Sequence, residues 1–522
     1  MNRLGLASVV VALVLGSAAA CGGDEGEALA PGADGGVRTE GDGGAVVPGS
    51  EDASVVPSGG DGGTGPSLLD VDCPALPMPA AGASTVYVDG STTGPEDGTK
   101  AAPYQSVTKA FSSAPKGSVL WVARGIYREN LTVPDKDLSV VGGFASGFAS
   151  RSDACATILE AFDTSKAVLS ASASVKRFAL DGITVQKGAR GLEVSGDSTV
   201  GASFAIARSV FTGNGRPEAV GGAAYLDRVN ATITGSVFKD NRASKGAAVA
   251  SNGETADLVI DACRFEKNLG HSDHGGALYL SPRTGKVTRN TVRSNEIGKT
   301  AGYGWGGGMI VFKAGQTPVK VDLAFNVFTD NLASVGGAVF VDDGANVTMS
   351  HDLVFRNRAY PQAGVARGGA VYVDGLGPAN GSTFAADHVT FADNARDVSG
   401  AATAGRGGAV YMENGSKATI TNAILWKNGD EALFGDGTTA FTVHHAIAPS
   451  ACAGGAACSV GAGVFLPATS PFADEAAGDW HERAAAIDAA DPASPFAAEP
   501  APNGGRANLG VYGGTGEAST SP

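Results

Sequence analysis

The sequence predicts an all-β chain folded as a parallel β-helix, a solenoid in which each coil stacks on the coil before it. Three observations support this prediction. A bulky apolar residue followed three positions later by Asn recurs along the chain, a Gly-Gly segment recurs between these copies, and the segments between them are short and rich in β-branched residues. We also expect a cap helix before the first coils and a disordered tether before that helix.

The first twenty residues have the composition of an export signal. Arg3 precedes an almost wholly apolar run, Leu4 to Leu15, which is too short to span a bilayer, and small residues then lead to Cys21. This ending resembles a bacterial lipobox, which implies cleavage before Cys21 and lipidation of its thiol. By the same analogy Gly22 favours the outer membrane. We expect an outer-membrane or cell-surface lipoprotein, attached to the membrane through its lipid alone; the alternative is plain secretion.

Composition separates a tether from the folded part. Residues 21–72 are rich in Gly and acidic residues and poor in bulky ones, so we expect the lipidated Cys and a disordered, solvated tether there. The whole chain of 522 residues has a formal net charge of −15, which argues against nucleic acid as a partner. Residues 73–450 are expected to form the β-helix, and residues 451–522 an irregular C-terminal segment.

The first repeat places an Asn at one fixed turn of each coil. Such an Asn tolerates a left-handed backbone and can hydrogen-bond to the Asn above and below it, so the column would form a ladder. Copies recur every 26 to 37 residues, and the longer intervals are expected to hold projecting loops. The pairs are Phe211/Asn214, Phe238/Asn241, Phe265/Asn268, Val292/Asn295, Phe328/Asn331, Val354/Asn357, Phe391/Asn394 and Leu425/Asn428.

The second repeat is Gly-Gly followed by a small, an apolar and a bulky residue. Paired glycines supply positive φ and allow neighbouring coils to approach closely. The copies begin at Gly221, Gly275, Gly306, Gly336, Gly368 and Gly407, with a degenerate copy at Lys245.

Together these repeats resemble those of the chlamydial polymorphic outer-membrane proteins, over about residues 85 to 450. That resemblance implies a right-handed parallel β-helix of the pectin-lyase-like superfamily. Residues Gln105 to Ala114 place apolar side chains on one helical face and precede the strand Val119–Val122, which resembles the capped entry of many extracellular β-helix proteins.

Five cysteines remain after Cys21. Export permits disulfides. We expect Cys452 to pair with Cys458 across a small loop, and Cys73 with Cys155 to join the tether exit to the first coils. Cys263 falls in a column of small or polar residues and is interpreted as a structural thiol. No metal-type cysteine spacing is present.

A polar column is the main candidate for chemistry. Five residues beyond the second glycine, Asp342, Asp374 and Glu413 fall on successive coils, with Lys313 near them. Stacked carboxylates would repel one another, so they either splay into water or share a cation such as calcium. The alternative, which we favour, is that these residues only cap the transition from strand to turn.

Two functions remain open. The first is a non-catalytic surface protein that presents a long face for adhesion or for binding a polysaccharide, where Tyr303 and Trp305 would stack on a sugar ring unless they pack on the solenoid's flank. The second is a polysaccharide lyase or glycoside hydrolase that uses the acidic column. No cofactor is indicated, apart from calcium in the second case.

Overall fold

The computed structural model describes residues 72–79, 84–172, 174–196, 201–272, 274–298, 304–315, 317–360, 366–396, 406–429 and 431–522. The chain divides into the units Met1–Ala53 and Ser54–Pro522, and every described residue belongs to the second. The signal peptide, the lipidation site Cys21, the tether up to residue 71 and Tyr303 lie outside the described residues. Among the residues described, no helix combines the length and apolar character needed to cross a bilayer.

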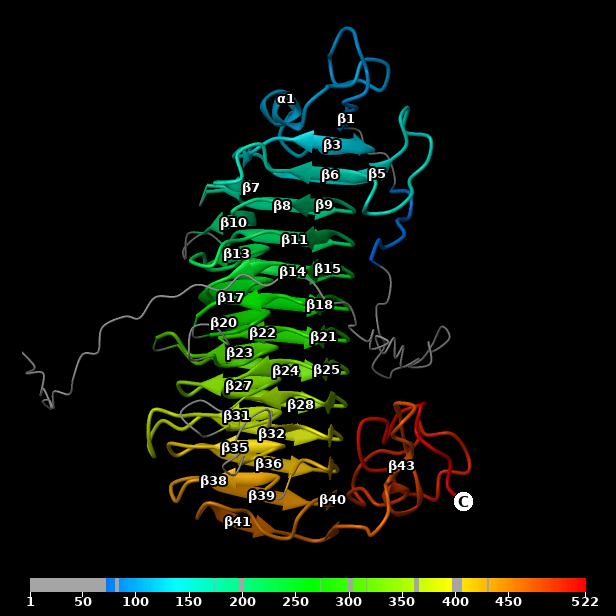
Figure 1. Cartoon of the computed structure of the whole chain (residues 1–522). Helices are drawn as coiled ribbons and strands as arrows, with labels where there is room; N and C mark the ends of the chain where they lie inside the picture. The colour runs from blue at the N-terminus through cyan, green and yellow to red at the C-terminus, as the bar shows by residue number, and fades with distance from the viewer. Residues whose placement is uncertain are drawn as a thin grey trace, which may run out of the picture. The chain divides into compact units, whose positions relative to one another are not determined.

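Parallel strands stack coil upon coil, as the repeats predict (Figure 1). The first ladder contains β1 (Thr85–Val88), β2 (Val119–Ala123), β5 (Leu138–Phe144), β8 (Arg177–Asp181), β11 (Ser203–Ala207), β14 (Asn230–Thr234), β17 (Val249–Asp261), β20 (Leu278–Thr288), β24 (Lys320–Ala324), β28 (Asn346–Ser350), β32 (Thr383–Asp387), β36 (Lys417–Thr421), β39 (Ala440–His444) and β41 (Ala457–Val460). The second ladder contains β4 (Leu131–Val133), β7 (Ala167–Ala171), β10 (Arg190–Ser195), β13 (Ala224–Asp227), β17, β20, β23 (Met309–Phe312), β27 (Val339–Asp342), β31 (Val371–Val373), β35 (Val410–Met412) and β38 (Leu433–Gly435). The long strands β17 and β20 belong to both ladders.

The other sides of the coils are built in the same way. The third ladder contains β3 (Gly125–Arg128), β6 (Thr157–Glu160), β9 (Thr184–Gln186), β12 (Val210–Thr212), β15 (Val237–Lys239), β18 (Arg264–Glu266), β21 (Thr291–Arg293), β25 (Val327–Thr329), β29 (Leu353–Phe355), β33 (Thr390–Ala392), β37 (Ile424–Trp426), β40 (Ala446–Ile447) and β42 (Val464–Phe465). A short fourth ladder contains β16 (Arg242–Ala243), β19 (Leu269–Gly270), β22 (Glu296–Ile297), β26 (Leu332–Ala333), β30 (Arg358–Ala359) and β34 (Ala395–Arg396). Parallel pairing therefore continues past residue 450, to β41 and β42.

The core follows from alternation within each strand. In β14 the residues Ala231 and Ile233 are buried between more exposed neighbours, as expected for a strand with one face in a core. Corresponding core residues of successive coils stack: the rings of Phe211, Phe238 and Phe265 lie 5.1 Å apart from one to the next and are fully buried. A coil too small to have its own core thus shares a continuous one with its neighbours.

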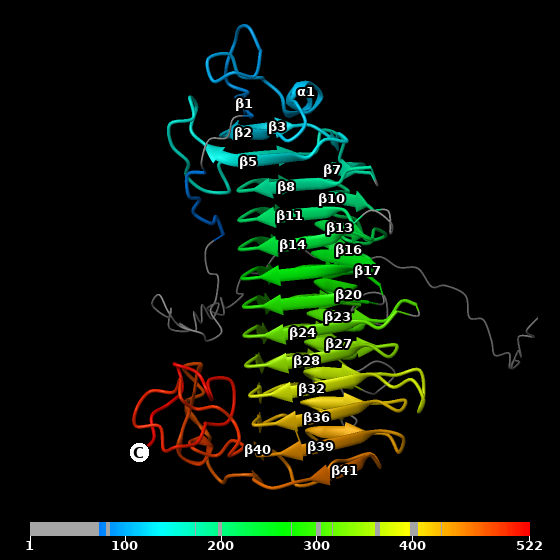
Figure 2. The same cartoon turned by 180° about the vertical axis from the view of Figure 1, so that it is seen from behind.

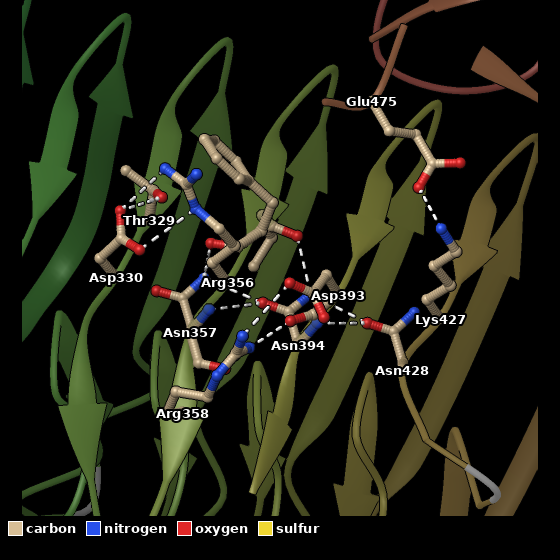
Figure 3. A network of polar contacts seen from close by, with 12 residues as sticks. Thr329, Asp330, Arg356, Asn357, Arg358, Asp393, Asn394, Lys427, Asn428 and Glu475 are labelled. Carbon is tan, nitrogen blue, oxygen red and sulfur yellow. Dashed lines mark hydrogen bonds and ion pairs between the residues drawn. The ribbon is translucent and has the colours of Figure 1, made fainter. Parts of the chain in front are cut away.

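The asparagine ladder runs the length of the repeats. In each rung the side-chain nitrogen donates to the Oδ1 of the Asn one coil later, at 2.9–3.2 Å (Figure 3 shows the last two rungs). All members are at most 3% exposed, so the ladder is a structural feature of the core and offers no binding surface. Its members, in chain order, are Asn214, Asn241, Asn268, Asn295, Asn331, Asn357, Asn394 and Asn428.

The left-handed residue of this turn is the one before each ladder Asn. Although Asn tolerates a left-handed backbone, none of the eight has a positive φ, and the residue before each of them has it. The Asn is held in place by its hydrogen bonds to the coils on either side, so the tight turn falls on its predecessor. Before Asn331, Asn357 and Asn394, for example, the left-handed residues are Asp330 (φ 57°), Arg356 (φ 53°) and Asp393 (φ 50°).

A second polar ladder faces the core at another turn. The main-chain nitrogen of each residue donates to the side chain of the next in the series Ser209, Ser236, Cys263, Asn290, Asn326 and Asp352. Cys263 is a free, buried thiol of this ladder, and burial raises its pKa to about 12. It is therefore a structural group rather than a reactive one.

The N-terminal coils are covered by α1 (Val107–Ser113) (Figure 1). The Glu129 carboxylate accepts from the main-chain nitrogens of Val107 and Thr108, where the helix begins. At the other end, the Lys136 Nζ donates to three main-chain oxygens, at residues 111, 112 and 114. Both charges complement the helix dipole. A disulfide between Cys73 and Cys155 secures this end, and Cys452–Cys458 secures the last coil, as expected.

The residues after β42 turn back along the third ladder (Figure 2). This C-terminal segment (residues 466–522) contains the antiparallel pair β43 (Phe472–Asp474) and β44 (Asp479–Glu482) and the 3₁₀ turn η1 (Ala484–Ala486). Leu509, Tyr512 and Trp480 are buried there against outward-facing residues of the solenoid. The Gly510 nitrogen also donates to the Asn422 oxygen at 2.8 Å.

Candidate functional site

The Gly-Gly repeat directly precedes the strands of the second ladder and sets the register of the residues in those strands. At the fourth repeat, Gly336 has φ +64°, and a β-carbon on Gly337 would meet the Gly369 oxygen of the next coil at 2.3 Å. One glycine thus makes the turn and the other allows the coils to approach closely. Three columns of residues from β23 to β38 are aligned as a result.

The acidic column comprises Asp342, Asp374, Glu413 and Asp436. Its members directly follow residues that pair in register, and the main-chain nitrogen of each later member donates to the preceding coil at 2.8–3.2 Å. Asp342, Asp374 and Glu413 therefore stand on successive coils, and all three are half-buried. Asp436 has no recognisable sequence signal, because no Gly-Gly pair precedes β38 to mark its register.

The aromatic column lies beside it and points outward from the same strands. The rings of Tyr372 and Tyr411 stack at 5.1 Å, and that of Tyr411 stacks on Phe434 at 4.9 Å. Phe340 precedes them, and all four side chains are at most 7% exposed. This column could have been predicted from the sequence, because the bulky last residue of the Gly-Gly repeat marks its members.

The flanking column comprises the residues just before the glycine pairs: His274, Trp305, Val335, Arg367 and Arg406, which are bridged in parallel from coil to coil. The Arg406 guanidinium lies 4.9 Å from the centre of the Phe434 ring, and that of Arg367 lies 5.8 Å from the Tyr411 ring. The aromatic column is thus bordered by cations on one side and by carboxylates on the other.

Glu413 connects all three columns. Its two oxygens accept from the hydroxyls of Tyr372 at 2.5 Å and Tyr411 at 2.7 Å, and its Oε1 lies 3.5 Å from Arg367. Burial, together with the charge of Glu413, raises the pKa of both tyrosines. The tyrosines therefore remain neutral donors and hold the carboxylate in one position.

Asp342 and Asp374 have a different environment. Burial raises the pKa of Asp342 to about 7, with further contributions from the charges of Asp343 and Asp374. Burial also raises the pKa of Asp374, whose Oδ1 accepts from the Gly375 nitrogen and the Asn414 amide, both at 2.8 Å. Near neutral pH this part of the column carries an exchangeable proton.

The described carboxylates do not form a three-ligand cation site. Within the described ranges, the only His, Cys, Asp or Glu trio with ligand atoms within 4.8 Å of one another is Cys73, Asp153 and Cys155, whose cysteines form a disulfide. Lys313 lies near the column, with its Cδ 3.9 Å from where a β-carbon on Gly344 would stand. It forms no ion pair with a carboxylate of the described residues.

Trp305 packs on the flank of the solenoid. Its ring lies edge-on to that of His274 at 4.4 Å and 6.0 Å from that of Phe340, and its side chain is half-buried. The structure therefore joins Trp305 to the flanking column, while Tyr303 is outside the described residues.

Comparisons with known proteins concern the fold. No curated protein sequence matches the chain. Among solved structures, the crystal structure of the pectate lyase Pel9A is similar, with 12% identity and a TM-score of 0.43, covering 82% of this chain and 95% of that one. Residues 167–384 match the family model described as a right-handed beta helix region. The parallel coils of this chain therefore form a right-handed β-helix.

Proposed function

We propose that this protein binds an extracellular glycan along the face formed by the acidic and flanking columns, which the buried aromatic column supports from beneath. The observation that carries the proposal is the fixed position of Glu413, which two tyrosines and Arg367 hold beside other carboxylates in register. Sugar hydroxyls both donate and accept hydrogen bonds, so carboxylates beside guanidinium groups suit them. The coil repeat would present equivalent groups to successive sugar units.

Binding to a panel of neutral and uronate-containing glycans, with and without calcium, tests the proposal. We expect the full chain to bind at least one of them, and Arg367→Ala to weaken that binding by about tenfold or more. Thr419→Ala, on the exposed face of β36 in the first ladder, is the matched control and should bind like the unmodified chain. Absence of binding to every glycan, or equal binding by both variants, would contradict the proposal.

A second candidate is cleavage of the bound glycan, and the raised pKa of Asp342 favours it. A carboxyl group with a pKa of about 7, beside a second carboxylate, suits a general acid in glycoside hydrolysis. New reducing or unsaturated ends in the same panel, lost in Asp342→Asn, would establish cleavage. Binding without such ends would leave the non-catalytic function.

We also propose that the protein is exported and anchored through Cys21 in the outer membrane or at the cell surface. Two disulfides support export, because they persist in oxidising compartments. Mass measurement of the N-terminal peptide should show a lipid on Cys21, and Cys21→Ser should release the protein from the membrane fraction. An unmodified Cys21 in a soluble protein would instead indicate plain secretion.

A further inference from the structure

The last coil of the solenoid has an open edge. Among the described strands, β41 pairs with β39 alone and β42 pairs with β40 alone, and all four residues of β41 are exposed. The C-terminal segment leaves this coil and packs on the flank, so no described element lies beyond β41 (Figures 1 and 2). Main-chain donors and acceptors of an unpaired edge are available to pair with another strand.

The open edge also lacks the charges that normally protect such edges. Residues 446–473 contain no Asp, Glu, Lys or Arg, although the whole chain has a net charge of −15. Two large apolar side chains are exposed here, Val460 at 37% and Leu466 at 61%. Natural sheets usually block an exposed edge with charged residues, a bulge or a covering element. At this coil the described residues show none of these.

The opposite end of the solenoid is a less suitable partner, because its edge strand β3, which pairs with β6 alone, contains the exposed charge of Arg128. There α1 covers the first coils, with Val107, Ala110 and Phe111 buried in the shared core. A head-to-tail contact would therefore place a charged edge against the uncharged one, and the better match for the uncharged edge is the same edge on a second copy. A twofold axis at the middle of β41 brings the residues beside it near their own counterparts, so a charge there would meet a like charge, and an uncharged edge avoids this.

We propose that two copies of this chain associate end to end, with β41 of one copy pairing with β41 of the other about a twofold axis. The pairing extends both solenoids into one antiparallel assembly. It covers the end of the solenoid, where the exposed apolar side chains lie, and leaves the acidic and flanking columns of each copy uncovered along their length.

Light scattering combined with sedimentation of the full chain carrying Cys21→Ser, which accepts no lipid, measures this association. We expect a dimer whose dissociation constant rises by about tenfold or more in Ser459→Lys and likewise in Ser459→Glu, because each places like charges near the axis. An equal mixture of the two variants should restore the dimer, since opposite charges then meet. Thr419→Lys occupies the same outward column two coils earlier and should leave dimerisation unchanged.

Three outcomes would overturn the proposal. One is a monomer up to about 100 µM, a concentration at which even a weak dimer is visible. Another is a dimer that Ser459→Lys and Thr419→Lys weaken equally. Growth into long filaments would show a head-to-tail contact instead of a closed twofold one. Circular dichroism of each variant identifies any loss of dimer that is caused by unfolding.

Discussion

Between the end members Asn214 and Asn428, the side chain of each ladder asparagine uses all its hydrogen-bonding capacity inside the core. Asn268 donates from Nδ2 to the Phe238 oxygen and to Asn295, and its Oδ1 accepts from the main chain and side chain of Asn241. No single hydrogen bond here is exceptional in length. The stability comes from the completeness of the network, because a missing rung leaves buried polar atoms without partners.

Asn268→Ala should therefore lower the free energy of unfolding by about 3 kcal/mol, because two donors of Asn241 lose their acceptor in the core. Urea unfolding followed by circular dichroism measures this. Asn252→Ala, at an exposed position, is the matched control and should change stability by less than about 0.5 kcal/mol. Equal effects of the two substitutions would show that the ladder adds nothing to stability.

Asp352 ends the second polar ladder and makes stability depend on pH. Asn290 and Asn326 use Nδ2 to donate to main-chain oxygens of the preceding coil, whereas the corresponding Oδ2 of Asp352 is buried without a partner. Burial raises the pKa of Asp352 to about 7 from an ordinary value of 3.8. The group stabilises the fold fully below pH 4, and this stability is lost as the pH rises to about 7.

Asp352→Asn should remove this dependence, because the amide keeps the acceptor for Asn326 and supplies the missing donor. We expect its melting temperature to exceed that of the unmodified chain by several degrees at pH 8 and to match it at pH 4. Differential scanning calorimetry at the two pH values measures the difference. A variant that is less stable at pH 8 would contradict the assignment.

At the scale of elements, the docking of the C-terminal segment depends on a pair of stacked histidines. The rings of His351 and His388 are parallel at 5.1 Å, and the His351 Nε2 lies 3.1 Å from the Gly513 oxygen. Burial lowers the pKa of His351 to about 4, with a further contribution from His388. The other charged groups at this contact are Asp387, 3.2 Å from His388, and Glu499.

Because the docked His351 resists protonation and the undocked one does not, docking is strongest above pH 6.5 and weakens as the pH falls towards 4. We expect hydrogen exchange of residues 484–521 to accelerate over this range while exchange in β36 and β39 stays slow. His351→Phe keeps a ring in the stack but does not titrate, so it should remove most of the pH effect. Exchange that is independent of pH in the unmodified chain would refute this account.

The sequence predicted the elements that have a local pattern and missed those whose position depends on tertiary packing. The ladder asparagines, the Gly-Gly turns and α1 follow local patterns whose physical cause lies in a single coil. Arg367 was not predicted as a site residue, because its register follows a loop of irregular length. Asp436 was not predicted, because its coil lacks the glycine pair. The position of Leu509 against the third ladder carries no repeat signal at all, since it depends on tertiary packing alone.

For the whole molecule, each coil is stabilised by its contacts with the coils on either side. The end coils have a neighbour on one side only, so their stability needs additional support. The disulfide Cys73–Cys155 spans 82 residues and secures the N-terminal coils, whereas Cys452–Cys458 spans only 6. A longer closed loop removes more entropy from the unfolded chain.

Replacing Cys73 and Cys155 by Ser should therefore lower the stability of the N-terminal coils by about 2 kcal/mol more than the same replacement at Cys452 and Cys458. Urea unfolding of the two double variants, with the fluorescence of Trp121 in β2 as the reporter, measures the difference. A larger loss at the short loop would show that the chain-entropy argument does not hold here.

Three successive rungs of the asparagine ladder are spaced by the same 27 residues. A tandem duplication of residues 241–267 would consequently insert one intact layer without shifting any column above or below it. The solenoid can thus lengthen in steps of about 4.8 Å. Evolution can change its length by duplicating single coils, because each added coil extends the existing core.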